Sequence, residues 1–244
     1  MSDVRIEELM AVLCAREIRD WERIGVGANS PIPAAGALLA SKLWAPNTRE
    51  AGSSGDAPFV GAKEFTDLLQ RGKVDLFYFS AVQVDKRGNM NLQYVQTKDG
   101  RRRRFQGAYA APVYYYGAKR TVMFRAEHSQ RFFVDTVDYI TAAAAQPERL
   151  RRHGTLTKVI TPMAVLQYNP ATELLELFSI HDGYSFNEVQ AATGFTLVKA
   201  DGFAPTILPT AEEIAVLRTQ VFDDMVGLYP QFVAQMRSPQ EDTR

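Results

Sequence analysis

The residues best placed to do chemistry follow the first strand that the sequence predicts. Residues 23–27 predict a short strand, and residues 34–44, rich in alanine and leucine, predict a helix behind two prolines. Ligands of open α/β sheets bind at the carboxyl ends of such strands. We therefore expect the backbone of Gly27 and Ala28 and the amide of Asn29 to line a pocket. An ordinary loop role for Asn29 is the alternative.

A second polar group follows the strand expected over residues 74–80. Gln83 and Asp85 come where this strand ends, and Gly88 and Asn89 suit the positive φ of a tight turn. Two interpretations stay open for Gln83 and Asp85. They position a substrate, or they cap this turn together with Asn89.

Three tyrosines follow one another within residues 113–125, which predict two short strands separated by Gly117. Consecutive aromatic residues on a strand usually belong to a core or an interface. The alternative for Tyr114, Tyr115 and Tyr116 is that they stack on a polycyclic or adenine group.

Several common catalytic motifs are absent from the sequence. His128, His153 and His181 lack metal-ligand spacing, and no G-x-S-x-G elbow, P-loop or complete G-x-G-x-x-G is present. Cys14 is the only cysteine and lies on the apolar stripe of a helix expected over residues 6–21. That position predicts a small buried hydrophobe rather than a reactive thiol. We expect no metal site, and neither a kinase, an NTPase nor a classical dinucleotide enzyme.

The charges of the chain balance, with 28 lysines and arginines against 28 aspartates and glutamates. No overall field therefore draws the chain to nucleic acid, and the polar loop expected at residues 97–104, with its four arginines, is more typical of a solvated or partner-facing loop. No stretch approaches the ~18 apolar residues of a membrane span, and the N-terminus lacks a signal-peptide pattern. We expect a soluble cytoplasmic protein without nucleic-acid or membrane partners.

The order of expected elements predicts one α/β domain over residues 1–244, frayed from residue 237. Strands alternate with helices at the start, and the later strands, residues 158–161, 164–168 and 174–180, favour antiparallel pairing. Two later helices have predicted capping boxes, Ser185 with Glu188 and Thr210 with Glu213. The fold class we expect is α/β, an open mixed sheet flanked by helices with a more antiparallel C-terminal half.

Five segments, in this order, resemble the β subunit of glutaconate coenzyme A transferase, a family I CoA transferase. Residues 83–89, with the pattern Q-V-D-x-x-G-N, are the most specific part of this resemblance, which covers nearly the whole chain. The chain is also similar to the β subunits of related steroid-ring hydrolases. The five segments are residues 26–47, 77–91, 102–112, 131–141 and 192–197.

The resemblance implies a heteromeric enzyme, with two α and two β subunits, whose active site lies between them. The substrate is then an acyl-CoA thioester, and no cofactor is permanently bound. In true transferases a β-subunit glutamate attacks the thioester while backbone N–H groups stabilise the developing oxyanion. The positions that the resemblance assigns are Gly27, Ala28, Asn29 and Gln83 for the oxyanion and substrate pocket, and Gln106, Gly107, Ala108, Tyr109 and Ala110 for CoA.

The sequence departs from the family pattern at both functional segments. Glu50 is the carboxylate that corresponds best to the nucleophile, but it comes about three residues early, in a polar loop expected over residues 45–58. A solvated loop glutamate is the alternative. Tyr109 replaces a family glycine and would narrow a CoA channel, or pack as structure. Some relatives decarboxylate their substrate with a β-subunit cysteine. We do not expect that chemistry here, because Cys14 lies on the first expected helix, well before the nucleophile segment.

The resemblance leaves the reaction open. CoA transfer between carboxylic acids and a derived hydrolytic or carbon–carbon-cleaving reaction are equally compatible with the altered segments. The alternative from another class is a non-catalytic scaffold subunit whose α partner carries the reactive groups.

Overall fold

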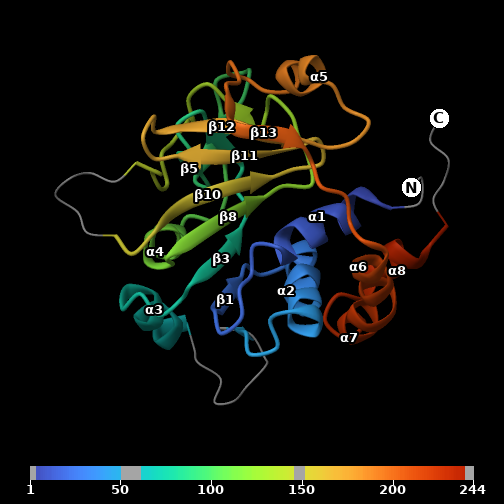
Figure 1. The fold of residues 1–244 in the computed structure, drawn as a ribbon. Coiled ribbons are helices and arrows are strands. Elements are labelled where there is room, and N and C mark those ends of the chain that lie inside the picture. Colours follow the sequence, from blue (N-terminus) through green and yellow to red (C-terminus); the bar gives the residue numbers. More distant parts are fainter. Residues whose placement is uncertain (1–3, 51–61, 146–151, 240–244) are drawn as a thin grey trace.

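The computed structural model describes residues 4–50, 62–145 and 152–239. Its centre is an eight-stranded mixed sheet in the order β13-β12-β11-β10-β8-β3-β1-β2 (Figure 1). The strands β2, β1, β3, β8 and β10 are parallel, β11 runs antiparallel to both β10 and β12, and β13 is parallel to β12. This arrangement confirms the expected α/β class with a more antiparallel second half. The bounds are β1 Arg23–Val26, β2 Arg49–Glu50, β3 Leu76–Phe79, β8 Arg120–Phe124, β10 Thr155–Ile160, β11 Ala164–Asn169, β12 Leu174–Ile180 and β13 Lys199–Pro205.

Two smaller sheets and the helices complete the described structure. The small sheets are β5-β4-β9, formed by Met90–Asn91, Gln83–Asp85 and Phe133–Val134, and the hairpin of β6 Tyr94–Gln96 with β7 Arg102–Arg104. The helices are α1 Ile6–Ala15, α2 Pro31–Leu43, α3 Ala62–Gln70, α4 Ala111–Gly117, α5 Phe186–Ala191, α6 Ala211–Val216, the π-helical turn η1 Leu217–Val221, α7 Phe222–Met225 and α8 Pro230–Arg237. No helix in the described ranges is long and apolar enough to cross a membrane.

The sheet separates two hydrophobic cores, because successive side chains of a strand point to opposite faces. In β3, Leu76 and Tyr78 pack with α1, α2 and the C-terminal helices, whereas Phe77 and Phe79 pack with α3 and α4. Figure 1 shows the two groups of helices on opposite sides of the parallel strands. Both faces of β3 are therefore buried, and its end can serve as a rigid platform for a site.

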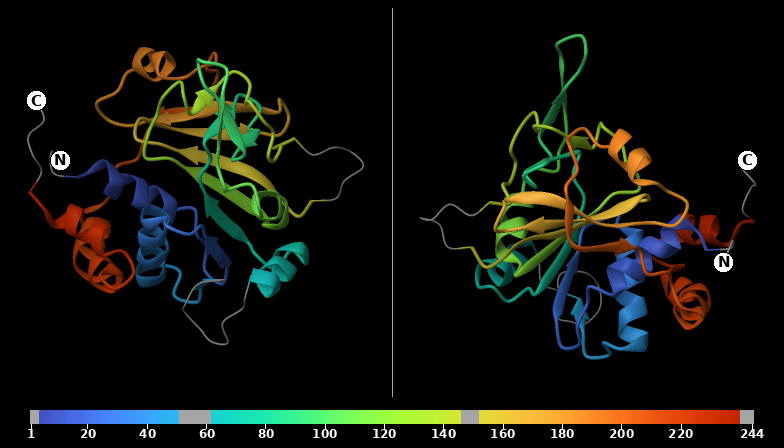
Figure 2. Two further views of the ribbon diagram at one scale, coloured as in Figure 1. Left: turned by 180° about the vertical axis from the view of Figure 1, so that it is seen from behind. Right: turned by 45° about the horizontal axis from the view of Figure 1, so that its top comes forward.

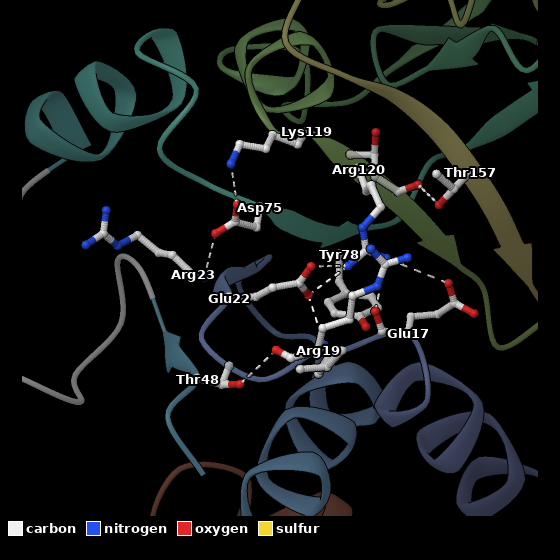
Figure 3. A network of polar contacts seen from close by, with 12 residues as sticks. Glu17, Arg19, Glu22, Arg23, Thr48, Asp75, Tyr78, Lys119, Arg120 and Thr157 are labelled. Carbon is white, nitrogen blue, oxygen red and sulfur yellow. Dashed lines mark hydrogen bonds and ion pairs between the residues drawn. The ribbon is translucent and has the colours of Figure 1, made fainter. Parts of the chain in front are cut away.

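A polar network fixes the amino-terminal ends of the parallel strands (Figure 3). Arg120 at the start of β8 donates to both carboxylate oxygens of Glu22 at 2.7 Å and to the carbonyl of Glu17 at 3.0 Å. Asp75, just before β3, accepts from the backbone N–H of Arg23 at 2.8 Å and from Lys119 at 2.6 Å. These bonds link the starts of β1, β3 and β8, so the opposite ends of the three strands are held in register.

Four sequence expectations differ from the structure. The helix expected over residues 6–21 ends at Ala15. The tyrosines lie on the helix α4 rather than on strands, because Pro112 begins a helix there. The expected polar loop at residues 97–104 is the tip and second strand of the β6–β7 hairpin. Within the expected loop at residues 45–58, Arg49 and Glu50 form an edge strand that is parallel to β1. The residues that follow, 51–61, lie outside the described part.

Candidate active site

The carboxyl ends of three neighbouring parallel strands surround a cavity of about 610 Å³. The segment from Gly27 to Ser30 follows β1, Ser80 follows β3, and Arg125 and Glu127 follow β8. This is the edge at which open α/β sheets bind ligands. The apolar part of the lining consists of Phe77, Phe79, Leu92, Ala111, Tyr114 and Phe124.

The loop after β1 presents a row of unused backbone donors. The N–H of Gly27 donates to the carbonyl of Tyr78 at 2.9 Å, which continues the β1–β3 ladder. Within the described residues, the N–H groups of Ala28, Asn29 and Ser30 donate to no acceptor. Asn29 has a φ of 54°, and α2 begins two residues later, at Pro31. Backbone N–H groups at a helix N-terminus can stabilise negative charge, such as the oxyanion of an acyl intermediate.

Arg125 is the positively charged side chain of the cavity lining. Its guanidinium makes only weak hydrogen bonds with the protein. Its Nη1 lies 3.5 Å from the carbonyl of Ala81 and its Nη2 lies 3.5 Å from Oε2 of Glu127. Both contacts are at the limit of a hydrogen bond. The guanidinium also lies 5.8 Å from the ring centroid of Phe132. A half-buried guanidinium with such weak partners is available to bind a ligand oxygen.

Glu127 is held as a carboxylate. Its Oε1 accepts from the Ser129 hydroxyl at 2.6 Å and from Nη2 of Arg131 at 2.7 Å. These bonds, first that of Ser129 and then that of Arg131, hold the pKa of Glu127 below its usual value. Glu127 therefore stays ionised at neutral pH and is poorly suited to donate a proton.

Two hydroxyls complete the polar lining. Ser80, half-buried at the end of β3, has no hydrogen-bond partner in the ranges that the structure describes. Tyr114 stacks on Phe77 with 4.9 Å between the ring centroids. Burial, and then the neighbouring Tyr109, raises the pKa of Tyr114, so its phenol remains protonated.

The three tyrosines point in different directions, because successive residues of a helix are rotated by about 100°. Tyr115 is fully buried and donates to the carbonyl of Gly88 at 2.8 Å. The hydroxyl of Tyr116 accepts from the N–H of Ala143 at 2.9 Å. These two belong to the core, as the first interpretation held, and Tyr114 lines the cavity.

The structure brings together part of the predicted site. Gly27, Ala28, Asn29 and Gly107 all line the cavity. A Cβ at Gly107 would lie 2.9 Å from Cδ2 of Leu92, so a side chain there would displace the cavity wall. The rest of the expected CoA segment, Gln106, Ala108, Tyr109 and Ala110, is not part of the lining. Tyr109 is 95% exposed and is not part of the lining.

Gln83 and Asp85 lie in the small sheet and are not part of the cavity lining. The Gln83 side chain accepts from Asn91 at 2.7 Å and from the N–H of Asp138 at 3.1 Å, and donates to the Asp138 carboxylate at 3.2 Å. Asp85 accepts from the side chain of Asn89 and from the N–H of Asn89, both at 3.0 Å. The turn-capping interpretation is confirmed for Asp85, whereas the side-chain bonds of Gln83 within the described residues are to Asn91 and Asp138 and not to this turn.

Glu50 ends the edge strand β2, and its Cα is paired with that of Ile24 in β1. Ile24 precedes Gly27 by three residues, and each strand residue advances the chain by about 3.3 Å. Measured along the strand direction, the backbone of Glu50 therefore lies about 10 Å before the cavity loop. The strand does run toward the cavity edge, because β1 and β2 are parallel.

The remaining titratable candidates have structural surroundings. Cys14 is fully buried, and burial raises the pKa of its thiol, so the expected buried hydrophobe is confirmed. Burial lowers the pKa of both His128 and His181 to about 4. Nε2 of His181 donates to the carbonyl of Thr161 at 2.8 Å, and its Nδ1 lies 2.8 Å from the hydroxyl of Thr206. No group of three or more potential metal ligands occurs in residues 4–50, 62–145 and 152–239.

The coenzyme A transferase family model matches residues 52–192, more than half of the chain. The chain belongs to the coenzyme A transferase family. The matched region includes β3, β8 and the cavity residues Ser80, Gly107 and Arg125.

Relatives within the family have different activities. The chain is 26% identical to one subunit of the 3-oxoadipate CoA-transferase of Pseudomonas knackmussii, over 89% of this chain and 94% of that protein. It is 25% identical to the cholesterol ring-cleaving hydrolase IpdB subunit of Rhodococcus jostii, over 89% and 92%.

Solved structures of the family share the fold. Glutaconate coenzyme A-transferase of Acidaminococcus fermentans superposes with a TM-score of 0.77 at 19% identity, covering 97% of this chain and 99% of that one. The decarboxylase AibA/AibB superposes with a TM-score of 0.76 at 24% identity, covering 88% and 94%.

Sequence reasoning missed Ser80, Arg125 and Glu127. Each follows the end of a parallel strand, which is the signal that could have found them. The sequence predicted a strand where β8 ends before Arg125. It did not predict that β8 lies beside β3, because 40 residues separate the two strands in sequence.

Proposed function

We propose that this chain is the β subunit of a two-subunit enzyme and binds an acyl-CoA thioester in the cavity at the ends of β1, β3 and β8. One observation carries this proposal: Ala28, Asn29 and Ser30, whose backbone N–H groups have no acceptor in the described residues, line the same cavity as the weakly partnered Arg125. Two relatives are named as subunits of heteromeric enzymes, which supports a partner α subunit here.

The thioester carbonyl oxygen binds at the N–H groups of Ala28, Asn29 and Ser30. Negative charge that develops on this oxygen during attack is stabilised there without reorganisation of the protein. Arg125 binds a second anionic or carbonyl oxygen of the substrate, and the aromatic wall with Tyr114 packs against its apolar part. CoA arrives as part of the substrate rather than as a resident cofactor. The assembly we propose contains two α and two β subunits and works in the cytoplasm.

The position of Glu50 favours a reaction other than classical CoA transfer. A nucleophile must reach the thioester carbon while the carbonyl oxygen binds at the donors of residues 28–30. The Glu50 backbone lies about 10 Å short of the level of that loop. We infer that hydrolytic or carbon–carbon-cleaving chemistry on the bound acyl-CoA, completed by groups of the α subunit, is the activity of the complex.

Glu50→Ala is expected to change turnover of the acyl-CoA substrate by less than about threefold, because the Glu50 backbone lies about 10 Å short of the loop at which the thioester binds. The measurement is steady-state kinetics of the reconstituted complex, together with hydroxylamine trapping of any glutamyl thioester. Glu64→Ala, which removes an exposed glutamate of α3, is the matched control. A loss of a thousandfold, with a trapped adduct that disappears in the variant, would establish transfer through Glu50 instead.

Classical transfer remains the second candidate, because β2 is parallel to β1 and so runs toward the cavity edge. Measuring CoA exchange between two carboxylic acids separates it from hydrolysis. The scaffold alternative predicts that a substitution of Arg125 leaves activity intact while interface substitutions abolish it.

A further inference from the structure

The β6–β7 hairpin carries a concentration of positive charge that the cavity does not explain. Within residues 98–104 lie one lysine and four arginines, and Asp99 is the only carboxylate. The rest of the chain must therefore carry a net negative charge, since the whole chain is neutral. All of these basic side chains are exposed, and the hairpin stands out from the body of the molecule (Figure 2, right).

Three of the four arginines are not neutralised by the protein. Arg101 pairs with Asp99 in the turn. The guanidinium carbon of Arg102 lies 4.6 Å from the ring centroid of Tyr94, and that of Arg103 lies 5.5 Å from that of Phe105. In the described part of the chain, no carboxylate pairs with Arg102, Arg103 or Arg104. Contacts with aromatic rings restrict two of these guanidinium groups while leaving their hydrogen-bond donors available.

The hairpin begins and ends at the cavity. Leu92, two residues before β6, and Gly107, three residues after β7, both belong to the cavity lining. Because a chain spans at most about 3.6 Å per residue, Arg104 lies within about 11 Å of Gly107. Arg104 pairs with Tyr94 at the base of the hairpin, whereas Arg102 pairs with Gln96 nearer to the tip. A ligand that leaves the cavity past Gly107 therefore meets Arg104 first and Arg102 next.

We propose that Arg102, Arg103 and Arg104 bind the phosphate groups at the nucleotide end of the CoA whose thioester lies in the cavity. This inference rests on the proposed function. It adds a binding site for the nucleotide end of the CoA whose thioester end lies in the cavity. CoA carries a diphosphate and a separate 3′-phosphate, and arginine binds phosphate oxygens through two parallel N–H groups. Arg102 and Arg104 lie on one face of β7 and Arg103 on the other, so the strand offers cations on both sides.

Two substrates that share the thioester but differ at the nucleotide end test this assignment. The enzyme is the complex of this chain with its α partner, and the substrates are the acyl-CoA that it consumes and the corresponding acyl-pantetheine. Arg104→Gln and Arg102→Gln are each expected to raise KM for acyl-CoA about tenfold with kcat unchanged. For acyl-pantetheine, both variants should keep the wild-type kcat/KM. Arg101→Gln, at the tip and paired with Asp99, is the control and should change neither.

The contradicting outcomes are distinct. An unchanged KM for acyl-CoA in the Arg102→Gln/Arg104→Gln double variant overturns the inference, and so does an equal loss with both substrates. Dissociation of the α partner on size exclusion would assign the arginines to the subunit interface and overturn it as well. Oligonucleotide binding that disappears in the double variant, with KM unaltered, would assign them to nucleic acid. If the wild-type complex consumes no thioester of either kind, the proposed function fails, and this inference fails with it.

Discussion

Arg125→Met is expected to lower kcat/KM for the acyl-CoA substrate by about a hundredfold to a thousandfold, because a bound substrate oxygen loses its charged hydrogen-bond partner. Methionine keeps much of the length and apolar bulk of the arginine stem, so the cavity wall is preserved. The guanidinium has only two contacts of 3.5 Å with protein oxygens, and most of its hydrogen bonding is available to a ligand. Steady-state kinetics of the complex measures the effect.

Arg131→Met is the matched control for this experiment. Arg131 also binds Glu127, at 2.7 Å, but its side chain is 85% exposed and does not line the cavity. If Arg125 acted only by orienting Glu127, the control would lose activity to a similar degree. A loss below about tenfold in Arg125→Met, or an equal loss in Arg131→Met, would contradict a direct role of Arg125 in substrate binding.

Gly36→Val is expected to reduce the free energy of unfolding by about 3 kcal/mol or more, because it overpacks a contact between two helices. A Cβ at Gly36 in α2 would lie 2.7 Å from the carbonyl oxygen of Ala11 and 2.9 Å from the backbone nitrogen of Ala15, both in α1. These are backbone atoms of a packed helix, and they cannot move aside as a flexible side chain could. Urea unfolding of the complex, followed by circular dichroism, measures the change.

Gly227→Ala provides the comparison for Gly36. A Cβ at Gly227 would meet no atom within 4 Å, so this substitution should leave stability within about 0.5 kcal/mol of wild type. Equal unfolding midpoints for Gly36→Val and wild type would show that α1 and α2 do not pack as closely as the structure places them.

Local signals in the sequence predicted the elements whose formation depends on neighbouring residues. The capping boxes are examples: the hydroxyls of Ser185 and Thr210 accept from the N–H groups of Glu188 and Glu213 at 3.3 and 3.1 Å. The strands β11 and β12 pair in the expected antiparallel way, and Asn169 in the turn between them accepts from the N–H of Ala171. In each case the side chain and the backbone group that it satisfies lie within a few residues.

The tyrosine segment was assigned to the wrong class for a physical reason. Aromatic residues favour strands on average, but tertiary packing overrides this preference. The burial of Tyr115 and the stacking of Tyr114 on Phe77 depend on residues far away in the sequence. Pro112 at the start of the segment was the local signal for a helix.

The candidate site could be predicted only where it depends on one strand and its own loop. Gly27, Ala28 and Asn29 follow β1 directly, and the sequence pointed to them. Ser80 and Arg125 complete the cavity because β3 lies between β1 and β8, an order that no local pattern encodes. Gly107, which only the family resemblance indicated, lies in the cavity lining beside Leu92, and this close approach is likewise a tertiary contact.

Selective chemical labelling of Ser80→Cys tests the central claim, that an acyl-CoA thioester occupies this cavity, most directly. The only natural cysteine of this chain, Cys14, is fully buried, so the introduced thiol becomes its reactive one. Iodoacetamide labelling of the complex is followed by mass spectrometry with and without acyl-CoA, and Ser238→Cys on the exposed C-terminal segment is the control. We predict that acyl-CoA slows labelling at position 80 at least about tenfold, the expected effect of near-complete site occupancy, and leaves position 238 unaffected. Equal labelling rates at position 80 with and without saturating acyl-CoA would contradict the account.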